Sequence, residues 1–159
     1  MLVPFCALAQ GIRAEGIVRD YPAVITPVIE FLTKHDINIH QMPCPELYFD
    51  KLRRPPKQKR AYADAKCQAA YASVAKNVVQ FVDLYAKNGY EVLAIMGIDF
   101  SPSCAVNLIT GPPPNRIIPG RGYFTDALSH ALRSRGFEVP LIGIKTKKPQ
   151  EAVAELQRV

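Results

Sequence analysis

The stretch Glu91-Val92-Leu93-Ala94-Ile95-Met96-Gly97-Ile98 decides the fold of this chain, together with Asp99-Phe100-Ser101-Pro102-Ser103-Cys104, which follows it. The first segment is a nearly continuous apolar run, which is typical of a strand buried on both faces of a parallel sheet. The second segment is polar, contains a proline and ends on a cysteine, so we expect the chain to leave the sheet there in a turn. A strand of this kind requires helices on both sides of its sheet.

Three further apolar runs are predicted to be strands of the same sheet. Residues 1–7 form the first, residues 37–42 alternate with a period of two, and residues 139–144 form the last. Together with the run at residues 91–98, these segments give a sheet of about four strands, or five at most.

Helical patterns separate these strands. Residues 21–35 carry apolar side chains at helical spacing, with Pro22 in the expected first turn and Pro27 as an expected kink. Residues 61–88 are rich in alanine and end at Asn88-Gly89, which is typical of a helix stop.

The rest of the chain completes the alternation. We predict helices over residues 123–135 and 149–157, and a loop over residues 105–119, where Gly111-Pro112-Pro113-Pro114 argues against regular structure. The predicted fold is therefore α/β: one domain over residues 1–159, three-layered and Rossmann-like, with a mainly parallel sheet of about four to five strands.

Length and composition narrow the class of protein. The 159 residues are 48% hydrophobic and 21% charged, as in an ordinary globular protein. We expect no membrane span, because every apolar run is too short. The apolar start lacks a basic segment and is followed by Arg13 and Glu15, so we interpret it as a strand rather than a signal peptide and expect a cytoplasmic protein. The sequence leaves the oligomeric state open.

Cysteines carry the main functional signal. Cys6, Cys44 and Cys104 each come at the end of a predicted strand, whereas Cys67 lies inside the alanine-rich helix, where a core role is favoured. Parallel strands deliver their carboxyl ends to one edge, so three thiols distant in sequence can meet there. Three soft ligands without a matching fourth suggest a metal or iron–sulfur centre with one open position.

Zinc and an iron–sulfur cluster are the two candidates for this centre. Structural zinc usually takes four ligands with a Cys-x-x-Cys pair, which this chain lacks. His40 is a possible fourth ligand, but an ordinary strand histidine is the favoured interpretation. Three thiolates suit a 4Fe–4S cluster whose fourth iron is free to bind a substrate atom.

These residues resemble the thiouracil desulfidase (TudS) family. The resemblance rests on Cys6, the Cys44-Pro45-Glu46 turn, the Ser101-Pro102-Ser103-Cys104 loop and the later Gly120-Arg121-Gly122-Tyr123-Phe124 turn, in this order along the whole chain. It implies that Cys6, Cys44 and Cys104 ligate a 4Fe–4S cluster whose open iron takes the sulfur of a thiolated nucleobase. It further implies that Glu46 is the active-site carboxylate and Ser101 an assisting serine.

The chain also differs from the usual pattern of that family. Ala7-Leu8-Ala9-Gln10-Gly11 replaces a Leu-Leu-Gly-like turn, and Leu47-Tyr48-Phe49-Asp50 replaces a glycine-rich stretch. The sequence is therefore that of a divergent relative, and the thiolated substrate is not specified by it.

Several polar side chains are candidates for the chemistry around the cysteines. Glu46, two residues from Cys44, is expected to take or return a proton, the alternative being a surface or capping glutamate. Ser101 and Ser103 can donate hydrogen bonds to substrate or cluster sulfur, or merely shape the turn around Pro102. Weaker candidates are Asp99, as a pocket wall, and Tyr48 or Phe49, as a stacking surface that is equally plausible as core.

A basic loop follows the second cysteine. Its six cations lie within residues 51–60 and contribute to a net charge of +6: Lys51, Arg53, Arg54, Lys57, Lys59 and Arg60. It is either a solvated loop or a rim that attracts a phosphate, a nucleotide or RNA. Three hypotheses follow: a cluster-dependent desulfidase acting on a small thiolated compound, a non-catalytic zinc- or cluster-binding module, and an RNA- or nucleotide-binding protein.

Overall fold

The computed structural model describes residues 1–17, 19–113 and 116–159, and it has a parallel sheet at its centre. The four strands are β1 (Leu2–Pro4), β2 (His40–Met42), β3 (Ile95–Ile98) and β6 (Leu141–Ile144). They pair in the order β2-β1-β3-β6, and every pairing is parallel. The sheet confirms the predicted fold class, although each strand is shorter than its apolar run.

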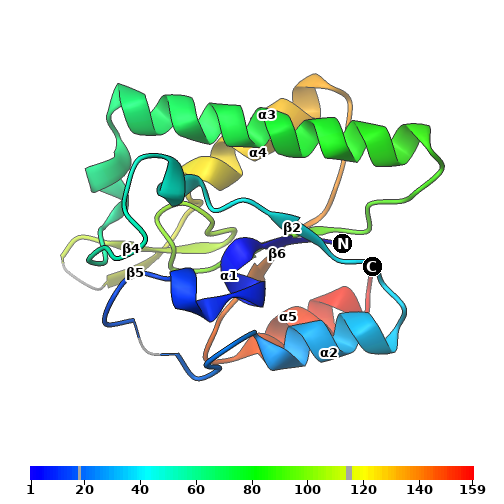
Figure 1. Cartoon of the computed structure of the whole chain (residues 1–159), viewed down its shortest axis with the longest axis horizontal. Coiled ribbons are helices and arrows are strands. Elements are labelled where there is room, and N and C mark those ends of the chain that lie inside the picture. Colours follow the sequence, from blue (N-terminus) through cyan, green and yellow to red (C-terminus); the bar gives the residue numbers. More distant parts are fainter. Residues whose placement is uncertain (18, 114–115) are drawn as a thin grey trace.

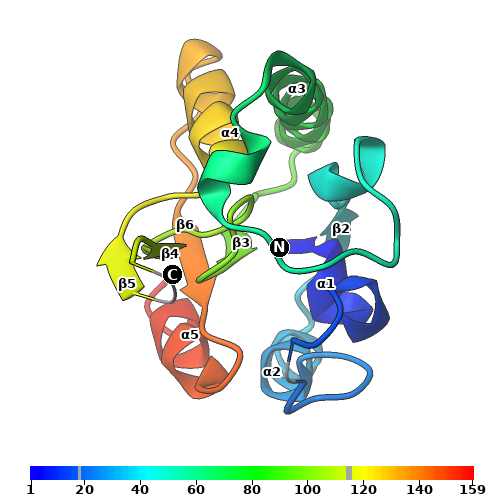
Figure 2. The ribbon, with the colours of Figure 1, turned by 90° about the vertical axis from the view of Figure 1, so that its left-hand side faces the viewer.

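Helices cover both faces of the sheet and make three layers (Figures 1 and 2). One face carries α3 (Ala65–Lys87) and α4 (Tyr123–Ser134), and the other carries α2 (Thr26–Lys34) and α5 (Pro149–Leu156). Two separate apolar cores result. Leu2 and Ile95 belong to the α3/α4 core, whereas their neighbours Val3 and Met96 belong to the α2/α5 core, as the alternation along strands requires.

The long helix α3 begins and ends on local signals. Asp64 caps it by accepting a hydrogen bond from the Cys67 N–H at 3.0 Å, which typically stabilises a helix by about 1 kcal/mol. It ends before Gly89, whose φ of +77° is a left-handed conformation that glycine adopts without strain. The predicted helix was slightly long at its start, because Lys59–Tyr62 form a separate 3-10 turn, η3.

Two predictions about the first half of the chain were wrong. The first strand stops at Pro4, and Cys6 lies in the short helix α1 (Phe5–Leu8), which is followed by the 3-10 turn η1 (Gln10–Ile12). The next helix starts at Thr26, so Pro22 is outside it and Pro27 occupies its first turn. A proline is tolerated there because its missing N–H has no helical partner, and no kink results.

The predicted loop over residues 105–119 was also wrong. This region holds a two-stranded antiparallel hairpin, β4 (Leu108–Gly111) and β5 (Arg116–Pro119). Pro112 and Pro113 lie in the connection between the two strands, so they interrupt no ladder hydrogen bond. Pro114, part of the predicted breaker, lies outside the described residues.

The sheet order places the cysteines. β2, β1 and β3 are neighbours, and Cys44, Cys6 and Cys104 follow the carboxyl ends of these three strands. The chain leaves β1 toward one side, to β2, and later returns on the other side, to β3. In open α/β sheets, ligand sites form where the strand order reverses in this way.

Candidate functional site

The three cysteines are held by three different local structures. Cys6 lies in α1, Cys44 precedes the 3-10 turn η2 (Pro45–Tyr48), and Cys104 ends the turn that follows β3. These three residues are each partly exposed, although protein surrounds most of their thiol groups, whereas Cys67 is buried in the α3/α4 core, as predicted for it.

Burial and mutual repulsion suppress ionisation of the three thiols. Burial, and then the neighbouring Cys44, raise the pKa of Cys6 from 9.0 to about 12. Burial, followed by Cys44 and Cys6, raises the pKa of Cys104 well above its ordinary value. Burial and then Glu46 raise the pKa of Cys44. The thiols and the Glu46 carboxylate are therefore near enough to interact electrostatically, and a cationic centre among them would reverse these shifts.

The described residues do not form a ready-made site for one metal ion. Within residues 1–17, 19–113 and 116–159, no group of three His, Cys, Asp or Glu side chains is placed so that it could hold a metal ion. The choice between zinc and an iron–sulfur cluster therefore stays a prediction from the sequence.

Glu46 is buried between two partners and is not a surface residue. Only 7% of it is exposed. Its Oε2 accepts from Arg54 Nε at 2.8 Å and lies 2.7 Å from the second terminal nitrogen of the guanidinium, while its Oε1 accepts from Ser103 Oγ at 2.7 Å. Burial alone would lower the pKa of Arg54, but the Glu46 charge and hydrogen bond raise it.

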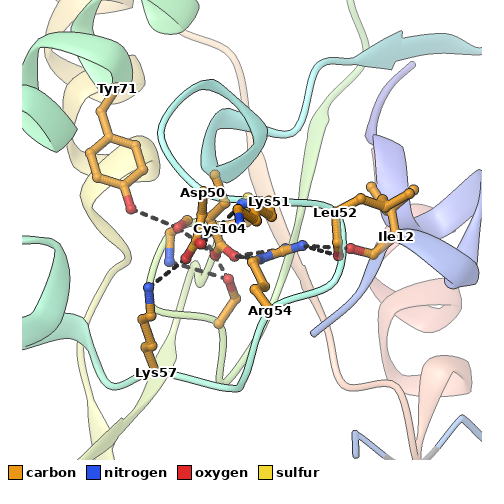
Figure 3. Close-up of polar contacts among 11 residues, drawn as sticks. Ile12, Asp50, Lys51, Leu52, Arg54, Lys57, Tyr71 and Cys104 are labelled. Carbon is orange, nitrogen blue, oxygen red and sulfur yellow. Dashed lines mark hydrogen bonds and ion pairs between the residues drawn. The ribbon is translucent and has the colours of Figure 1, made fainter. Parts of the chain in front are cut away.

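Ser103 extends this network to α3. The Tyr71 hydroxyl lies 2.8 Å from Ser103 Oγ (Figure 3), and both residues are almost fully buried. Since the single Ser103 hydroxyl hydrogen goes to Glu46, Tyr71 is the donor to Ser103. Burial raises the pKa of Tyr71, which keeps its phenol protonated for this role.

Ser101 shapes the Cys104 turn. Its Oγ accepts from the backbone N–H of Ser103 at 3.2 Å and from that of Cys104 at 3.0 Å. Its hydroxyl also opposes part of the rise in the Cys104 pKa. The contacts of Ser101 are thus those of a residue that shapes the turn. The same contacts place its hydroxyl beside Cys104, a predicted ligand.

Two glycines allow the Cys104 turn to pack tightly. A Cβ on Gly97 would lie 2.1 Å from the Cys104 carbonyl oxygen, and a Cβ on Gly122 would lie 2.2 Å from the Ser103 carbonyl carbon. The turn is thus enclosed between β3 and the start of α4. This close approach gives a physical reason for the second glycine of the Gly-x-Gly pattern at residues 120–122.

The weaker candidates have structural surroundings. Asp99 is buried, and its Oδ1 accepts from the backbone N–H groups of residues 106–108. Phe49 packs against Tyr62 and Tyr71 in the core, whereas Tyr48 is 56% exposed. His40 Nδ1 lies 2.8 Å from the Tyr85 hydroxyl on α3, which agrees with the favoured interpretation of an ordinary histidine.

The basic loop 51–60 is only partly a solvated rim. Arg54 is buried against Glu46, Lys57 pairs with Asp50, and Lys59 donates to the Arg121 carbonyl at 2.7 Å and pairs with Asp126. Figure 3 shows the Arg54 and Lys57 contacts. The exposed remainder is Lys51, Arg53 and Arg60. RNA or phosphate binding by these cations stays a prediction.

No sequence pattern indicated that Arg54, Tyr71 or Arg13 is part of the site. Arg13 donates to Gln10 Oε1 at 3.3 Å, the Gln10 amide donates to the Cys6 carbonyl, and the Arg13 charge opposes the rise in the Cys6 pKa. A single arginine inside a basic run, or a tyrosine on a helix, carries no pattern that separates it from its neighbours.

A cavity of about 540 Å³ lies away from the cysteines. It is lined by residues that precede or begin the strands, among them Ile37, His40, Tyr90 and Leu93. It is thus at the amino ends of the strands, opposite the cysteines. None of the described helices is long and apolar enough to cross a membrane.

Comparison with known proteins supports the fold. No protein-family profile matches the chain. An uncharacterized protein of Methanocaldococcus jannaschii is 29% identical over 94 residues, which are 59% of this chain and 55% of that protein, so the match spans about half the length of this relative.

A solved structure matches the whole chain. The [4Fe-4S]-dependent thiouracil desulfidase TudS superimposes with a TM-score of 0.56 at 20% identity, covering 100% of this chain and 98% of that one. The resemblance detected in the sequence is confirmed at the level of the fold, which this chain shares with a thiouracil desulfidase.

Proposed function

We propose that this protein is an iron–sulfur-dependent desulfidase that removes sulfur from a small thiolated compound, such as a thiolated nucleobase. The observation that carries the proposal is the meeting of three thiol-bearing segments and one buried carboxylate at the switch point of the sheet. The fold shared with a protein named as a [4Fe-4S]-dependent thiouracil desulfidase supports it.

Cys6, Cys44 and Cys104 are the residues that would hold a 4Fe–4S cluster. Their soft sulfur donors match its irons, and with three ligands one iron keeps an open position. When bound, the cluster supplies that open iron as a Lewis acid with affinity for the substrate's sulfur. The overall reaction is hydrolytic: C=S and water give C=O and hydrogen sulfide, without redox change at carbon.

The chain's own residues would manage the proton. Glu46 is the candidate general base, since its carboxylate lies beside Cys44 and interacts with the Cys6 thiol. Its Oε2 contacts two nitrogens of Arg54, whereas its Oε1 accepts from Ser103 alone, so Oε1 is the oxygen with a lone pair left to take the proton of water. Ser103 acts through Glu46, and Ser101 acts by fixing the backbone of Cys104.

The test is turnover by a variant that retains the cluster. Glu46→Gln preserves the shape of the side chain but not its basicity, so we expect normal iron content and a loss of about 10²- to 10⁴-fold in the rate of sulfide release from a thiouracil. Glu151→Gln is the matched control, because Glu151 forms an exposed pair with Lys145. Unchanged turnover in Glu46→Gln would refute the assignment of the base.

A further inference from the structure

Arg54 uses all three of its guanidinium nitrogens inside the protein. Nε and one terminal nitrogen contact Glu46 Oε2, and the other terminal nitrogen donates to the Ile12 carbonyl at 2.9 Å and the Leu52 carbonyl at 3.3 Å (Figure 3). The Arg54 carbonyl in turn accepts from the Glu15 N–H at 2.8 Å. One buried side chain from the basic loop therefore bridges two distant segments.

These bridged segments are the ones that carry cysteines. Ile12 ends the turn that follows the Cys6 helix, and Glu46 lies in the turn that follows Cys44. Glu46 extends the connection to Ser103, which precedes Cys104, and Ser103 is anchored by Tyr71. The network thus joins all three cysteine-bearing segments, which otherwise meet through the short strands β1, β2 and β3.

A buried ion pair of this kind is poorly explained by stability alone. The cost of removing both charges from water offsets most of their attraction, and apolar residues of similar volume often stabilise as well. A planar guanidinium provides a fixed set of directional contacts, which an apolar side chain does not provide. The expected benefit is therefore orientation of the segments.

We propose that Arg54 is a positioning residue that holds the three cysteine-bearing segments in their mutual arrangement, and so pre-organises them for the cluster. The part concerning the cluster rests on the proposed function, whereas the part concerning the segments does not. Arg54 touches neither substrate nor cluster in this scheme, and it acts through Glu46 and the Ile12 carbonyl.

Amide hydrogen exchange on the full chain without cluster tests the arrangement directly. In Arg54→Gln we expect exchange about tenfold faster or more over residues 10–15, 44–50 and 101–106, with α5 and the second half of α4 unchanged. Arg54→Lys keeps a cation for Glu46 but lacks the fork that reaches Ile12, so it should restore residues 44–50 more than residues 10–15. Arg53→Gln, an exposed arginine of the same loop, is the control and should leave all three segments protected.

Release of iron to a chelator after anaerobic reconstitution is the second readout. We expect release about tenfold faster in Arg54→Gln than in wild type or Arg53→Gln, with Arg54→Lys between them. If the three segments of Arg54→Gln exchange as slowly as those of wild type, the proposal is overturned. If Arg54→Gln does not fold, Arg54→Lys decides: equal protection of residues 10–15 in Arg54→Lys and wild type would also overturn the proposal. A wild-type chain that takes up no iron would refute the proposed function but leave the exchange result to decide the role of Arg54 in the segments.

Discussion

Two buried carboxylates lie near the cysteines, and they differ in what they hold. Glu46 accepts from two side chains, Arg54 and Ser103, that are 8 and 57 residues away. Asp99 accepts from three backbone N–H groups only 7 to 9 residues away, and its Oδ2 has no hydrogen-bond partner among the described residues. Glu46 therefore fixes how separate segments meet, whereas Asp99 fixes the shape of one loop.

This difference teaches that burial of a carboxylate does not by itself identify its role. Among the described residues, the hydrogen-bond donors to Asp99 are all backbone N–H groups, as for a residue that organises a turn. Glu46 adjoins the thiols and takes part in their electrostatics, as a residue of a functional site does.

The largest effect is expected on the Glu46 side. Arg54→Met leaves the Glu46 carboxylate buried without its cation and should lower the free energy of unfolding by about 3–5 kcal/mol. The double variant Glu46→Leu/Arg54→Met removes both charges and should be more stable than Arg54→Met. Urea denaturation of the variants measures both values, and a double variant destabilised by the sum of its singles would show that the two side chains are not coupled.

A second effect concerns the turn that supplies Ser103 to Glu46. Gly122→Ala places a Cβ 2.2 Å from the backbone of Ser103, so the turn must shift, and we expect a loss of up to about 3 kcal/mol. Gly11→Ala is the matched control, since nothing lies within 4 Å of a Cβ there. Thermal unfolding of both variants is the measurement. Equal melting temperatures would mean that the turn is not closely enclosed.

A smaller and local effect is expected on the Asp99 side. Asp99→Ala removes an acceptor for three backbone N–H groups and should cost about 2 kcal/mol, with faster amide exchange at residues 106–108. Asp99→Asn retains the accepting oxygen and should lose less. Faster exchange at residues 44–50 in Asp99→Ala would contradict the separation of the two roles.

The smallest effect is expected at Cys67, the cysteine outside the site. Burial, and then Asp64, raise the pKa of this thiol from 9.0 to about 11. The unfolded chain therefore releases this proton first, and stability falls as the pH rises from about 9 to 11. Urea denaturation across this range should give a shallower fall for Cys67→Ala than for wild type, and parallel curves would mean that the thiol is not shielded.

Much of the fold could be predicted from the sequence. The run at residues 91–98 and the strands around it fixed the parallel sheet, because apolar runs flanked by turn residues have few alternative structures. The hairpin at β4 and β5 could not be predicted, since its prolines break regular structure if they lie inside a strand and permit it if they lie between strands. No residue pattern in the apolar stretch at residues 1–9 indicated that the first strand ends at Pro4 and that a short helix follows.

The candidate site was predictable only in its cysteines, Glu46 and the serines. Sequence order places Cys6, Cys44 and Cys104 after strands, and topology then brings them to one edge. Their role as ligands stays a prediction. Arg54 was hidden in a basic run, because only packing against Glu46 distinguishes it from the exposed Arg53. Tyr71 meets Ser103 across 32 residues, which no local pattern encodes.

The central claim is that the three cysteines hold an iron–sulfur cluster, and iron and acid-labile sulfide per chain test it most directly. After anaerobic reconstitution we expect about four of each in the wild type and a large loss in Cys104→Ala, with Cys67→Ala as the control that retains both. No iron in the wild type, or equal iron in Cys104→Ala, would contradict the account.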